Sequence, residues 1–266
     1  MSGHSFTFTH ALCRKPANSI VDGLRATYLG TPDPAAFMAD HEDYVTALRA
    51  TGAVVDVLEP LEDFPDSVFI EDAALCLKGV AICLRPGADT RRAETAALRP
   101  DLVRLFGRVI DLQADGFVDG GDILCSDDEV IIGLSERTTA QGVRDLQPIV
   151  ERLGYRLRIF ETPKGILHFK SDSSLLDAET ILSTKRLNAS GCFSSYKVIE
   201  LADGEEAAAN AIRFNDTVFV DKKFPNTADL LRGHGYKVEP LSVAQAAKVD
   251  GGLSCMSLRY SADAGV

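Results

Sequence analysis

The chain has 266 residues, of which 45% are hydrophobic and 25% charged, and its formal net charge is −11 at pH 7. This composition is typical of a globular protein with enough apolar material for a sizeable core. The negative charge argues against a general nucleic-acid or anionic-membrane surface, although it suits a cationic small molecule. No apolar run reaches the length of a membrane span.

The cysteines indicate a reducing compartment. They stand at positions 13, 76, 83, 125, 192 and 255, without a Cys-x-x-Cys pair and without a histidine at a zinc-ligand spacing. The N-terminus lacks a basic leader followed by a long apolar run, so we expect a strand there rather than a signal peptide. A cytoplasmic protein with free thiols is the resulting prediction.

Strands and helices alternate along the first half of the chain. Strands are predicted at residues 5–13, 53–58, 68–69, 73–77, 80–84 and 108–112, and helices at 33–51 and 90–106. The helix at 33–51 is the clearest, because apolar side chains recur at helical spacing behind Thr31 or Asp33, either of which can cap its start.

The same order of elements recurs in the second half. Strands are predicted at 122–125, 129–133, 155–160, 165–169, 173–176, 180–183, 197–201, 209–214, 217–220 and 236–240, and helices at 138–153, 226–234 and 243–248. A weaker helical stretch lies between 183 and 197. Alternating apolar and polar residues predict a last strand at 256–260 with one buried face.

The repeating unit is strand–strand–helix–strand and is roughly fifty residues long. Polar landmarks mark successive units: Asp72, Asp119, His168, Asn210 and Cys255, which by subtraction lie 47, 49, 42 and 45 residues apart. Five units fit the length, and a closed ring is one way to protect the edges of their sheets. Periodicity alone also leaves open a plain α/β domain with irregular strands.

One cysteine stands where a glycine turn precedes the last strand. Residues 249–255 read Val-Asp-Gly-Gly-Leu-Ser-Cys, and glycines without a Cβ let the backbone approach a ligand closely. Cys255 is therefore a candidate accessible thiol. The alternative is a buried cysteine that acts as a small hydrophobe, and only partners elsewhere in the chain can decide between the two.

Three carboxylates stand among apolar side chains in residues 64–72, Phe-Pro-Asp-Ser-Val-Phe-Ile-Glu-Asp. Asp66, Glu71 and Asp72 lie between predicted strands rather than on a polar helix face. Carboxylates in such surroundings need a compensating cation or hydrogen-bond donors. A substrate guanidinium would supply both, because it is planar, always charged and rich in N–H donors.

Two further positions are candidates for acid–base chemistry. Asp119 stands in Asp-Gly-Gly-Asp at the start of a predicted strand, where a turn-stabilising, solvent-facing acid is the ordinary alternative. His168 stands in Leu-His-Phe-Lys inside a predicted apolar strand, where most histidines are satisfied core residues. Together with one well-placed cysteine and several acids, His168 becomes a candidate general acid/base.

Two arginines follow strands close to predicted helix starts. Arg91 stands in Ala-Asp-Thr-Arg-Arg and Arg137 in Leu-Ser-Glu-Arg-Thr. Solvated surface arginines are the ordinary interpretation. The functional alternative is a clamp for a substrate carboxylate, which arginine can grip in bidentate fashion.

Taken together, these motifs resemble the dimethylarginine dimethylaminohydrolase family of the guanidino-group-modifying (amidinotransferase) superfamily. The ordered set is FPDSVFIED, RPGADTRR, VDGGD, GLSERT, LHFKS and VDGGLSCMS, and it extends from about residue 13 to residue 260. Each motif alone is weak, whereas the set is specific. The resemblance implies a single α/β domain over residues 1–266, a five-bladed α/β propeller of ββαβ modules with pseudo-fivefold symmetry known as the pentein fold.

The resemblance also implies roles for individual residues. It makes Cys255 the nucleophile, His168 the proton donor and Asp119 the acid that orients the site. The other matching positions are expected to bind substrate: Leu24, Asp66, Glu71, Asp72, Arg91, Arg137 and Val249.

Within the substrate-binding set, the resemblance assigns different residues to the two ends of the molecule. Asp72, with Glu71 beside it, would hold the guanidinium. The two arginines would take the α-carboxylate, while Asp66 and the backbone carbonyl of Leu24 would receive the α-ammonium. Relatives often carry Ile where this chain has Val249, a change of one methylene that we expect to matter little.

The implied reaction is hydrolysis of the guanidinium C–N bond of asymmetric dimethylarginine or monomethylarginine. The products would be citrulline and dimethylamine or methylamine, formed through a covalent thiouronium on Cys255. No metal or organic cofactor is expected, because the electrophile is activated by its own charge. The expected partner is a small guanidino amino acid rather than nucleic acid or a membrane, and the sequence leaves a homodimer open.

Two alternatives remain on the sequence alone. The first is another guanidine hydrolase of the superfamily, such as an arginine deiminase; the paired arginines favour an amino-acid substrate over agmatine. An amidinotransferase ranks lower, because it needs an acceptor amine. The second is a non-catalytic binding member of the fold, which would lose the Cys/His/acid set. Residues 19–34 are the expected lid over the site.

Overall fold

The computed structural model of the chain describes residues 5–113 and 115–261. Over these residues the strands are β1 (His10–Arg14), β2 (Val54–Leu58), β3 (Ala74–Leu77), β4 (Val80–Cys83), β5 (Arg108–Asp111), β6 (Ile123–Cys125), β7 (Glu129–Leu134), β8 (Arg156–Glu161), β9 (Ser173–Leu175), β10 (Thr180–Ser183), β11 (Lys197–Glu200), β12 (Ile212–Phe214), β13 (Thr217–Asp221), β14 (Lys237–Leu241) and β15 (Leu258–Tyr260). The helices are α1 (Pro34–Ala50), α2 (Arg92–Leu105), α3 (Ala140–Arg152), α4 (Lys185–Asn188) and α5 (Pro225–Gly233).

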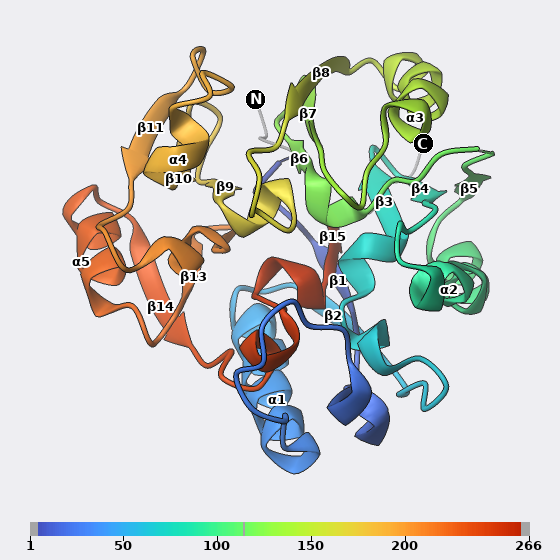
Figure 1. Cartoon of the computed structure of the whole chain (residues 1–266), viewed down its shortest axis with the longest axis horizontal. Coiled ribbons are helices and arrows are strands. Elements are labelled where there is room, and N and C mark those ends of the chain that lie inside the picture. The colour runs from blue at the N-terminus through green and yellow to red at the C-terminus, as the bar shows by residue number, and fades with distance from the viewer. Residues whose placement is uncertain (1–4, 114, 262–266) are drawn as a thin grey trace.

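The strands form five three-stranded sheets, which Figure 1 shows as sectors around a common centre with α1 to α5 following one another around the rim. Each sheet has the same internal order. Its first strand pairs antiparallel with the second, and the second pairs parallel with the third, as in β3–β4–β5. A parallel pair needs a crossover connection, and in each module a helix supplies it. The predicted five-module ββαβ ring is therefore confirmed.

The last strand closes the ring. β15 pairs antiparallel with β1, with Leu258 opposite Leu12, so the C-terminal part of the chain supplies the first strand of the first module. The ring cannot open without breaking this pairing. The first strands of the five sheets contribute to the lining of a central cavity of about 410 Å³.

Helix α1 illustrates how the sequence pattern becomes packing. Its N-cap residue Asp33 accepts two backbone N–H groups from the first turn, which explains why the helix begins at residue 34. Phe37, Tyr44 and Leu48 follow at helical spacing and are fully buried. They belong to the same apolar cluster as Cys255, so α1 supports the segment that carries the predicted nucleophile.

Short 3-10 turns precede the first strands of the sheets, and several predicted strands are wrong for this reason. The turns are Ile70–Ala73, Gly120–Asp122, Phe169–Ser171, Glu206–Ala209 and Ser254–Met256. No strand forms at 68–69 or 165–169, because these short apolar stretches lie in or beside the turns Pro65–Val68 and Phe169–Ser171, and a short apolar run alone does not distinguish a buried turn from a strand. The first strand begins only at residue 10, and the helix predicted at 243–248 is the 3-10 turn Ala246–Val249.

All five periodic landmarks lie in these turns or directly beside them. Asp72 and Cys255 lie within their turns, Asp119 and His168 directly precede theirs, and Asn210 directly follows its own. Residues more than forty positions apart in sequence thus come to equivalent places near the ring centre. Among the described residues, no helix combines the length and the apolar character needed to cross a bilayer.

Candidate active site

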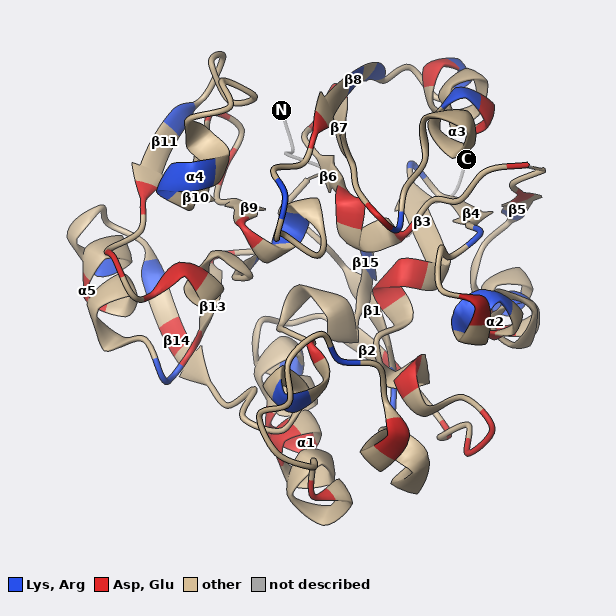
Figure 2. Ribbon diagram, viewed as in Figure 1, with Lys and Arg blue, Asp and Glu red and all other residues tan. Residues whose placement is uncertain are grey.

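A small cavity of about 30 Å³ lies where the turns converge. Figure 2 shows acidic and basic positions on the segments around the centre of the ring as well as on the outer helices. Eight of the predicted site residues line this cavity: Leu24, Asp66, Asp72, Arg91, Arg137, His168, Val249 and Cys255. Four residues that the sequence did not single out also line it: Phe69, Leu167, Asp250 and Gly251.

Cys255 is placed by two glycines that tolerate no side chain. A Cβ on Gly251 would lie 2.2 Å from Cε1 of Phe69, and one on Gly252 would lie 2.5 Å from Oδ1 of Asn210. The thiol is 9% exposed. Burial, followed by the negative charges of Glu71 and Asp72, raises the pKa of Cys255 to about 12. The thiol therefore needs a nearby cation to become a nucleophile at neutral pH.

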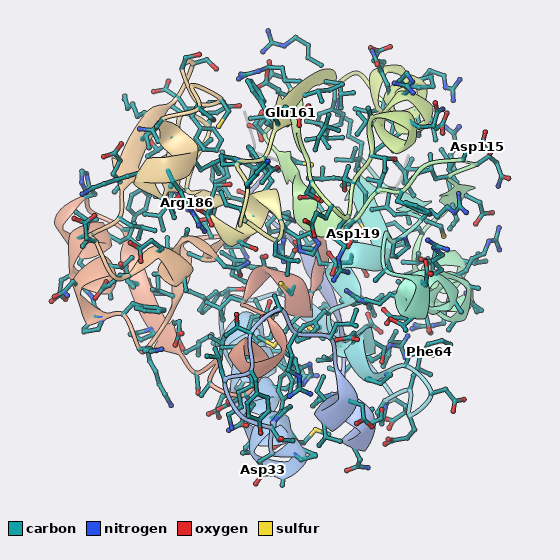
Figure 3. The ribbon with its side chains drawn as sticks, viewed as in Figure 1. Asp33, Phe64, Asp115, Asp119, Glu161 and Arg186 are labelled. Carbon is teal, nitrogen blue, oxygen red and sulfur yellow. The ribbon has the colours of Figure 1, made fainter. Side chains whose placement is uncertain are left out.

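His168 is held by Asp119. Nε2 of the imidazole lies 3.0 Å from Oδ2 of Asp119, and Oδ1 of that carboxylate accepts the backbone N–H of Gly87 at 2.6 Å. Asp119 lies near the ring centre, whereas Asp33 and Glu161 lie at the periphery (Figure 3). The prediction that His168 lies in a strand is wrong, because it stands in an extended loop just before a 3-10 turn.

The electrostatic surroundings of His168 favour the imidazolium. Burial alone would lower its pKa, but Asp72, the hydrogen bond to Asp119 and the charge of Asp122 outweigh burial and raise the pKa of His168 to about 9. His168 is thus protonated at neutral pH, as a proton donor must be.

Asp72 lies beside both His168 and Arg91. Its Oδ1 accepts the backbone N–H of Gly121 at 2.9 Å, and its Oδ2 forms an ion pair with Nη1 of Arg91. Burial favours the neutral acid, but His168 and Arg91 outweigh it and lower the pKa of Asp72 to about 2. A Cβ on Gly121 would lie 2.7 Å from Nδ1 of His168, so only glycine lets the imidazole pack this closely against the backbone.

Arg91 is buried and most of its donors are already used. Nε and Nη2 donate to both oxygens of Glu94 at 2.8–3.1 Å, and Nη2 also donates to the carbonyl of Phe69 at 2.8 Å. With Nη1 bound to Asp72, one N–H of Nη1 has no partner among the described residues. Glu94, which the sequence did not single out, thus fixes Arg91. The three-residue spacing on a helix was the available signal.

Arg137 is held more loosely than Arg91. Its side chain is 21% exposed, and Nη1 lies 3.9 Å from Oδ2 of Asp119, beyond hydrogen-bonding distance. The guanidinium of Arg137 can therefore turn toward a ligand carboxylate.

Asp66 and Leu24 meet at the side of the cavity. The backbone N–H of Leu24 donates to Oδ1 of Asp66 at 3.0 Å and to Oδ2 at 3.3 Å. Burial raises the pKa of Asp66, although Arg91 opposes this. The buried carboxylate would gain from a cation placed beside it.

Glu71 does not line the cavity. Its carboxylate accepts hydrogen bonds from Lys170 at 2.5 Å, Arg259 at 2.6 Å and the hydroxyl of Ser254 at 3.0 Å. Glu71 thus supports the turn before Cys255 from behind, while the adjacent Asp72 faces the cavity. Glu71 lines the central cavity of about 410 Å³ instead, so the structure does not bring it together with the other substrate-binding candidates around the 30 Å³ cavity.

Three buried groups come close enough to be considered as metal ligands. Potential ligand atoms of Asp72, Asp119 and His168 lie within 4.8 Å of one another. The carboxylates already accept hydrogen bonds from Arg91, the backbone and His168 itself. An imidazolium cannot coordinate a metal, so this chemistry fits a proton on His168 better than a metal ion.

Comparisons with known proteins point in the same direction. Residues 33–170 match the family model described as N,N dimethylarginine dimethylhydrolase, eukaryotic. A curated N(G),N(G)-dimethylarginine dimethylaminohydrolase from Pseudomonas aeruginosa is 37% identical over 95% of this chain and 100% of that protein. Another from Streptomyces coelicolor is 32% identical over 94% of this chain and 96% of that protein.

Solved structures agree with this fold. A mutant of the P. aeruginosa enzyme complexed with citrulline superposes with a TM-score of 0.93 at 37% identity, covering 96% of this chain and 100% of the other. The N-terminal domain of ArgZ, an arginine dihydrolase from cyanobacteria, gives a TM-score of 0.83 at 19% identity, covering 95% of this chain and 98% of that chain. This second likeness concerns the fold alone.

A five-module ring that brings a thiol, a histidine and carboxylates to its centre defines a guanidino-modifying enzyme of the pentein class. The relatives that match at 30% identity or more with a named activity belong to one family within that class. The chain belongs to the dimethylarginine dimethylaminohydrolase family.

Proposed function

We propose that the protein hydrolyses Nω-methylated arginines, asymmetric dimethylarginine and monomethylarginine, to citrulline and dimethylamine or methylamine. The observation that carries the proposal is the shared cavity of Cys255, His168 and Asp72, with Asp119 behind the histidine. Relatives named for this activity cover almost the whole chain.

The first half-reaction begins with a thiol of raised pKa. A guanidinium bound beside Asp72 places a positive charge near Cys255, which opposes the effect of the carboxylates and favours the thiolate, so the thiol releases its proton to solvent. The thiolate forms a bond to the guanidinium carbon. His168, protonated through its raised pKa, donates its proton to the departing amine as the C–N bond breaks. A covalent thiouronium on Cys255 and a neutral His168 remain.

The second half-reaction uses the neutral imidazole. His168 takes one proton from water, whose oxygen bonds to the same carbon, and the C–S bond then breaks so that Cys255 leaves as the thiolate. The remaining proton of that oxygen is lost to solvent, which leaves the carbonyl of citrulline and a protonated His168. Asp119 holds the ring through both steps by its 3.0 Å contact to Nε2. The mechanism requires no metal or organic cofactor, because the substrate carries its own activating charge.

The amino-acid end of the substrate would be recognised on the other side of the cavity. We assign the α-carboxylate to Arg137, whose guanidinium is free to turn, assisted by the remaining N–H of Arg91. The buried carboxylate of Asp66 and the carbonyl of Leu24 would receive the α-ammonium. Val249 would contact the aliphatic part of the substrate.

Substrate entry requires movement. A volume of about 30 Å³ is roughly that of one water molecule, far below that of an arginine. Residues 19–34 are the proposed lid, and the backbone N–H of Ala26 donates to Oδ2 of Asp250 at 2.5 Å across the cavity wall. Tyr28 and Leu29 are 72% and 62% exposed, so the outer part of this segment packs little against the ring, whereas Ile20 at its start is fully buried.

The two alternative functions, non-catalytic binding and arginine deimination, would require different residues or a different substrate at this site. A non-catalytic binding protein would not need the thiol, imidazole and carboxylates that converge here. An arginine deiminase would use the same constellation on unmethylated arginine, and the cavity walls do not favour that substrate over a methylated one. We also propose a cytoplasmic location, because all six cysteines are free.

One assay tests the proposal. Release of dimethylamine, methylamine and ammonia would be compared for asymmetric dimethylarginine, monomethylarginine and arginine at equal concentrations. We expect citrulline from the two methylated substrates to form faster than from arginine. Faster turnover of arginine would identify a deiminase, and no turnover of any of the three would contradict the proposed activity.

A further inference from the structure

The fifth module, β12–β13–β14, contributes no residue to the proposed chemistry, although its periodic landmark lies beside an equivalent turn. Asn210 directly follows the 3-10 turn Glu206–Ala209. Its side chain is half-buried and does not line the cavity of about 30 Å³. The contacts of this side chain therefore have to be explained in another way.

Asn210 joins the two segments that carry the reacting groups. Its Oδ1 accepts the backbone N–H of Ser254 at 2.9 Å, immediately before Cys255. Its Nδ2 donates to the carbonyl of Lys170 at 3.1 Å, two residues after His168. The same nitrogen lies 3.1 Å from Oγ of Ser254 and 4.0 Å from Sγ of Cys255.

We propose that Asn210 is a positioning residue that fixes the nucleophile turn of Cys255 against the segment of His168. The proposal rests on the function proposed above, in which these two groups act in turn on one carbon. The two segments are short 3-10 turns, and Glu71 already links the side chains of Lys170 and Ser254 from behind the nucleophile turn. Asn210 adds a link that binds the backbone of both turns directly. A displacement of about 1 Å between reacting groups can cost about a hundredfold in rate.

Gly252 supports this assignment from the other side of the contact. A Cβ on Gly252 would lie 2.5 Å from Oδ1 and 2.6 Å from Cγ of Asn210. Real side chains do not approach so closely, so the glycine is needed because the amide of Asn210 occupies that space. The missing side chain at Gly252 and the position of the Asn210 amide therefore depend on each other.

The chemistry of the amide is also specific. Nδ2 faces two oxygens and a sulfur, all of which can accept a hydrogen bond, while Oδ1 faces an N–H donor. An isosteric carboxylate would keep the bond from Ser254 but would turn an acceptor toward the carbonyl of Lys170. It would also place a negative charge near Cys255, which disfavours the thiolate.

The test compares Asn210→Asp with Asn215→Asp. Asn215 is also half-buried and bridges distant segments, since Oδ1 accepts the backbone N–H of Phe8 at 2.8 Å, but it lies outside the cavity. We measure kcat and KM with asymmetric dimethylarginine, and the rate of Cys255 alkylation by iodoacetamide between pH 7 and 10. The alkylation assay needs no substrate, so it remains informative even if the proposed activity fails.

For Asn210→Asp we expect kcat to fall about a hundredfold with KM within about threefold. We expect alkylation about tenfold slower across this pH range, equivalent to a pKa rise of about one unit. Asn215→Asp should leave both within twofold of wild type. If alkylation and kcat of folded Asn210→Asp stay within twofold of wild type, the inference is wrong.

A double-mutant cycle keeps the inference testable if the aspartate variant does not fold. Gly252→Ala alone should reduce kcat at least tenfold by displacing Asn210. Added to Asn210→Ala, which removes the amide that the new methyl would meet, it should cost less than threefold further. Fully additive losses would show that Gly252 and Asn210 act independently and would overturn the proposed pairing.

Discussion

The imidazole of His168 is held by a carboxylate that solvent does not reach: Nε2 lies 3.0 Å from Oδ2 of Asp119, whose side chain is 0% exposed. This contact uses one ring nitrogen, and the ring packs against Gly121, where a Cβ would lie 2.7 Å from Nδ1. The carboxylate and the glycine together fix the orientation in which the imidazole would act in both proposed half-reactions.

The first prediction concerns the pH dependence of turnover. Because the pKa of His168 in the free enzyme is raised to about 9, kcat/KM should fall as pH rises through about 9, where the proton donor is lost. The pH profile of kcat/KM with asymmetric dimethylarginine measures this directly. A decline already centred near pH 6.5 would show an ordinary histidine and would contradict the assigned surroundings.

The same shift affects stability. A folded-state pKa above the ordinary value of 6.5 contributes stability that is fully present below pH 6.5 and is lost as pH rises through about 9. The difference amounts to no more than about 3 kcal/mol. Urea unfolding of wild type and His168→Gln at pH 6 and pH 10 should show a loss that is larger in wild type by about this amount, because glutamine does not titrate while the other groups titrate in both proteins.

A second prediction concerns the nucleophile. Cys255→Ser should abolish citrulline formation, since a serine hydroxyl is far less easily ionised than a thiol. In free wild-type enzyme, the rate of iodoacetamide alkylation should still increase beyond pH 9, because burial, Glu71 and Asp72 raise the pKa of Cys255 to about 12. The serine variant supplies the background from the other five cysteines. A plateau by pH 8 would mean that the thiolate forms without substrate.

Arg137→Ala provides a third prediction. Removal of a charge-assisted contact to the α-carboxylate should raise KM about ten- to a hundredfold, with a smaller effect on kcat. Arg156→Ala is the matched control, because that side chain is 73% exposed and pairs with Asp128 at the surface. An unchanged KM for Arg137→Ala would show that this arginine does not bind the α-carboxylate of the substrate.

The fourth prediction separates two roles for Glu71. If Glu71 only supports the nucleophile turn, Glu71→Gln should leave KM within about threefold of wild type. It should lower the free energy of unfolding by about 3 kcal/mol, because Lys170 and Arg259 lose their buried counter-charge. Removal of the charge should also lower the pKa of Cys255 and speed its alkylation. A KM raised more than tenfold in a stable variant would restore the guanidinium-binding role.

The sequence predicts the ring well because each module repeats the same pattern. Hairpin turns, amphipathic helices and a period near fifty residues are local signals, and they recur in each unit. The five landmark residues follow from the same period, since equivalent positions in a closed ring converge. The convergence of Cys255, His168 and Asp72 in one cavity is a consequence of this symmetry.

The features that the sequence does not predict are the directions in which individual side chains point. His168 stands between the apolar residues Leu167 and Phe169, as it would in a strand, although the backbone turns there. Glu71 and Asp72 are adjacent but face opposite sides of their 3-10 turn. Glu94 lies on a helix start where a charged residue normally faces solvent, yet it is 4% exposed and grips Arg91. These directions are set by tertiary packing.

The fifth prediction tests the lid. The bond from the backbone N–H of Ala26 to Asp250 is charge-assisted, and Asp250 has a left-handed backbone (φ 56°) that asparagine also tolerates. Asp250→Asn should therefore weaken the bond without straining the turn. We expect faster tryptic cleavage after Arg25, which lies on the proposed lid, and a higher KM because the open state gains population.

The control for this variant is Asp203→Asn, an equivalent change at an exposed ion pair with Lys185, whose Nζ lies 2.8 Å away. It should leave both cleavage and KM unchanged. Substrate-bound enzyme should resist cleavage after Arg25 in both variants, because the lid must close over an arginine-sized ligand that the 30 Å³ cavity cannot admit in its present form. If Asp250→Asn is cleaved no faster than wild type, the segment around Ala26 does not open as a lid, and substrate must enter by another movement.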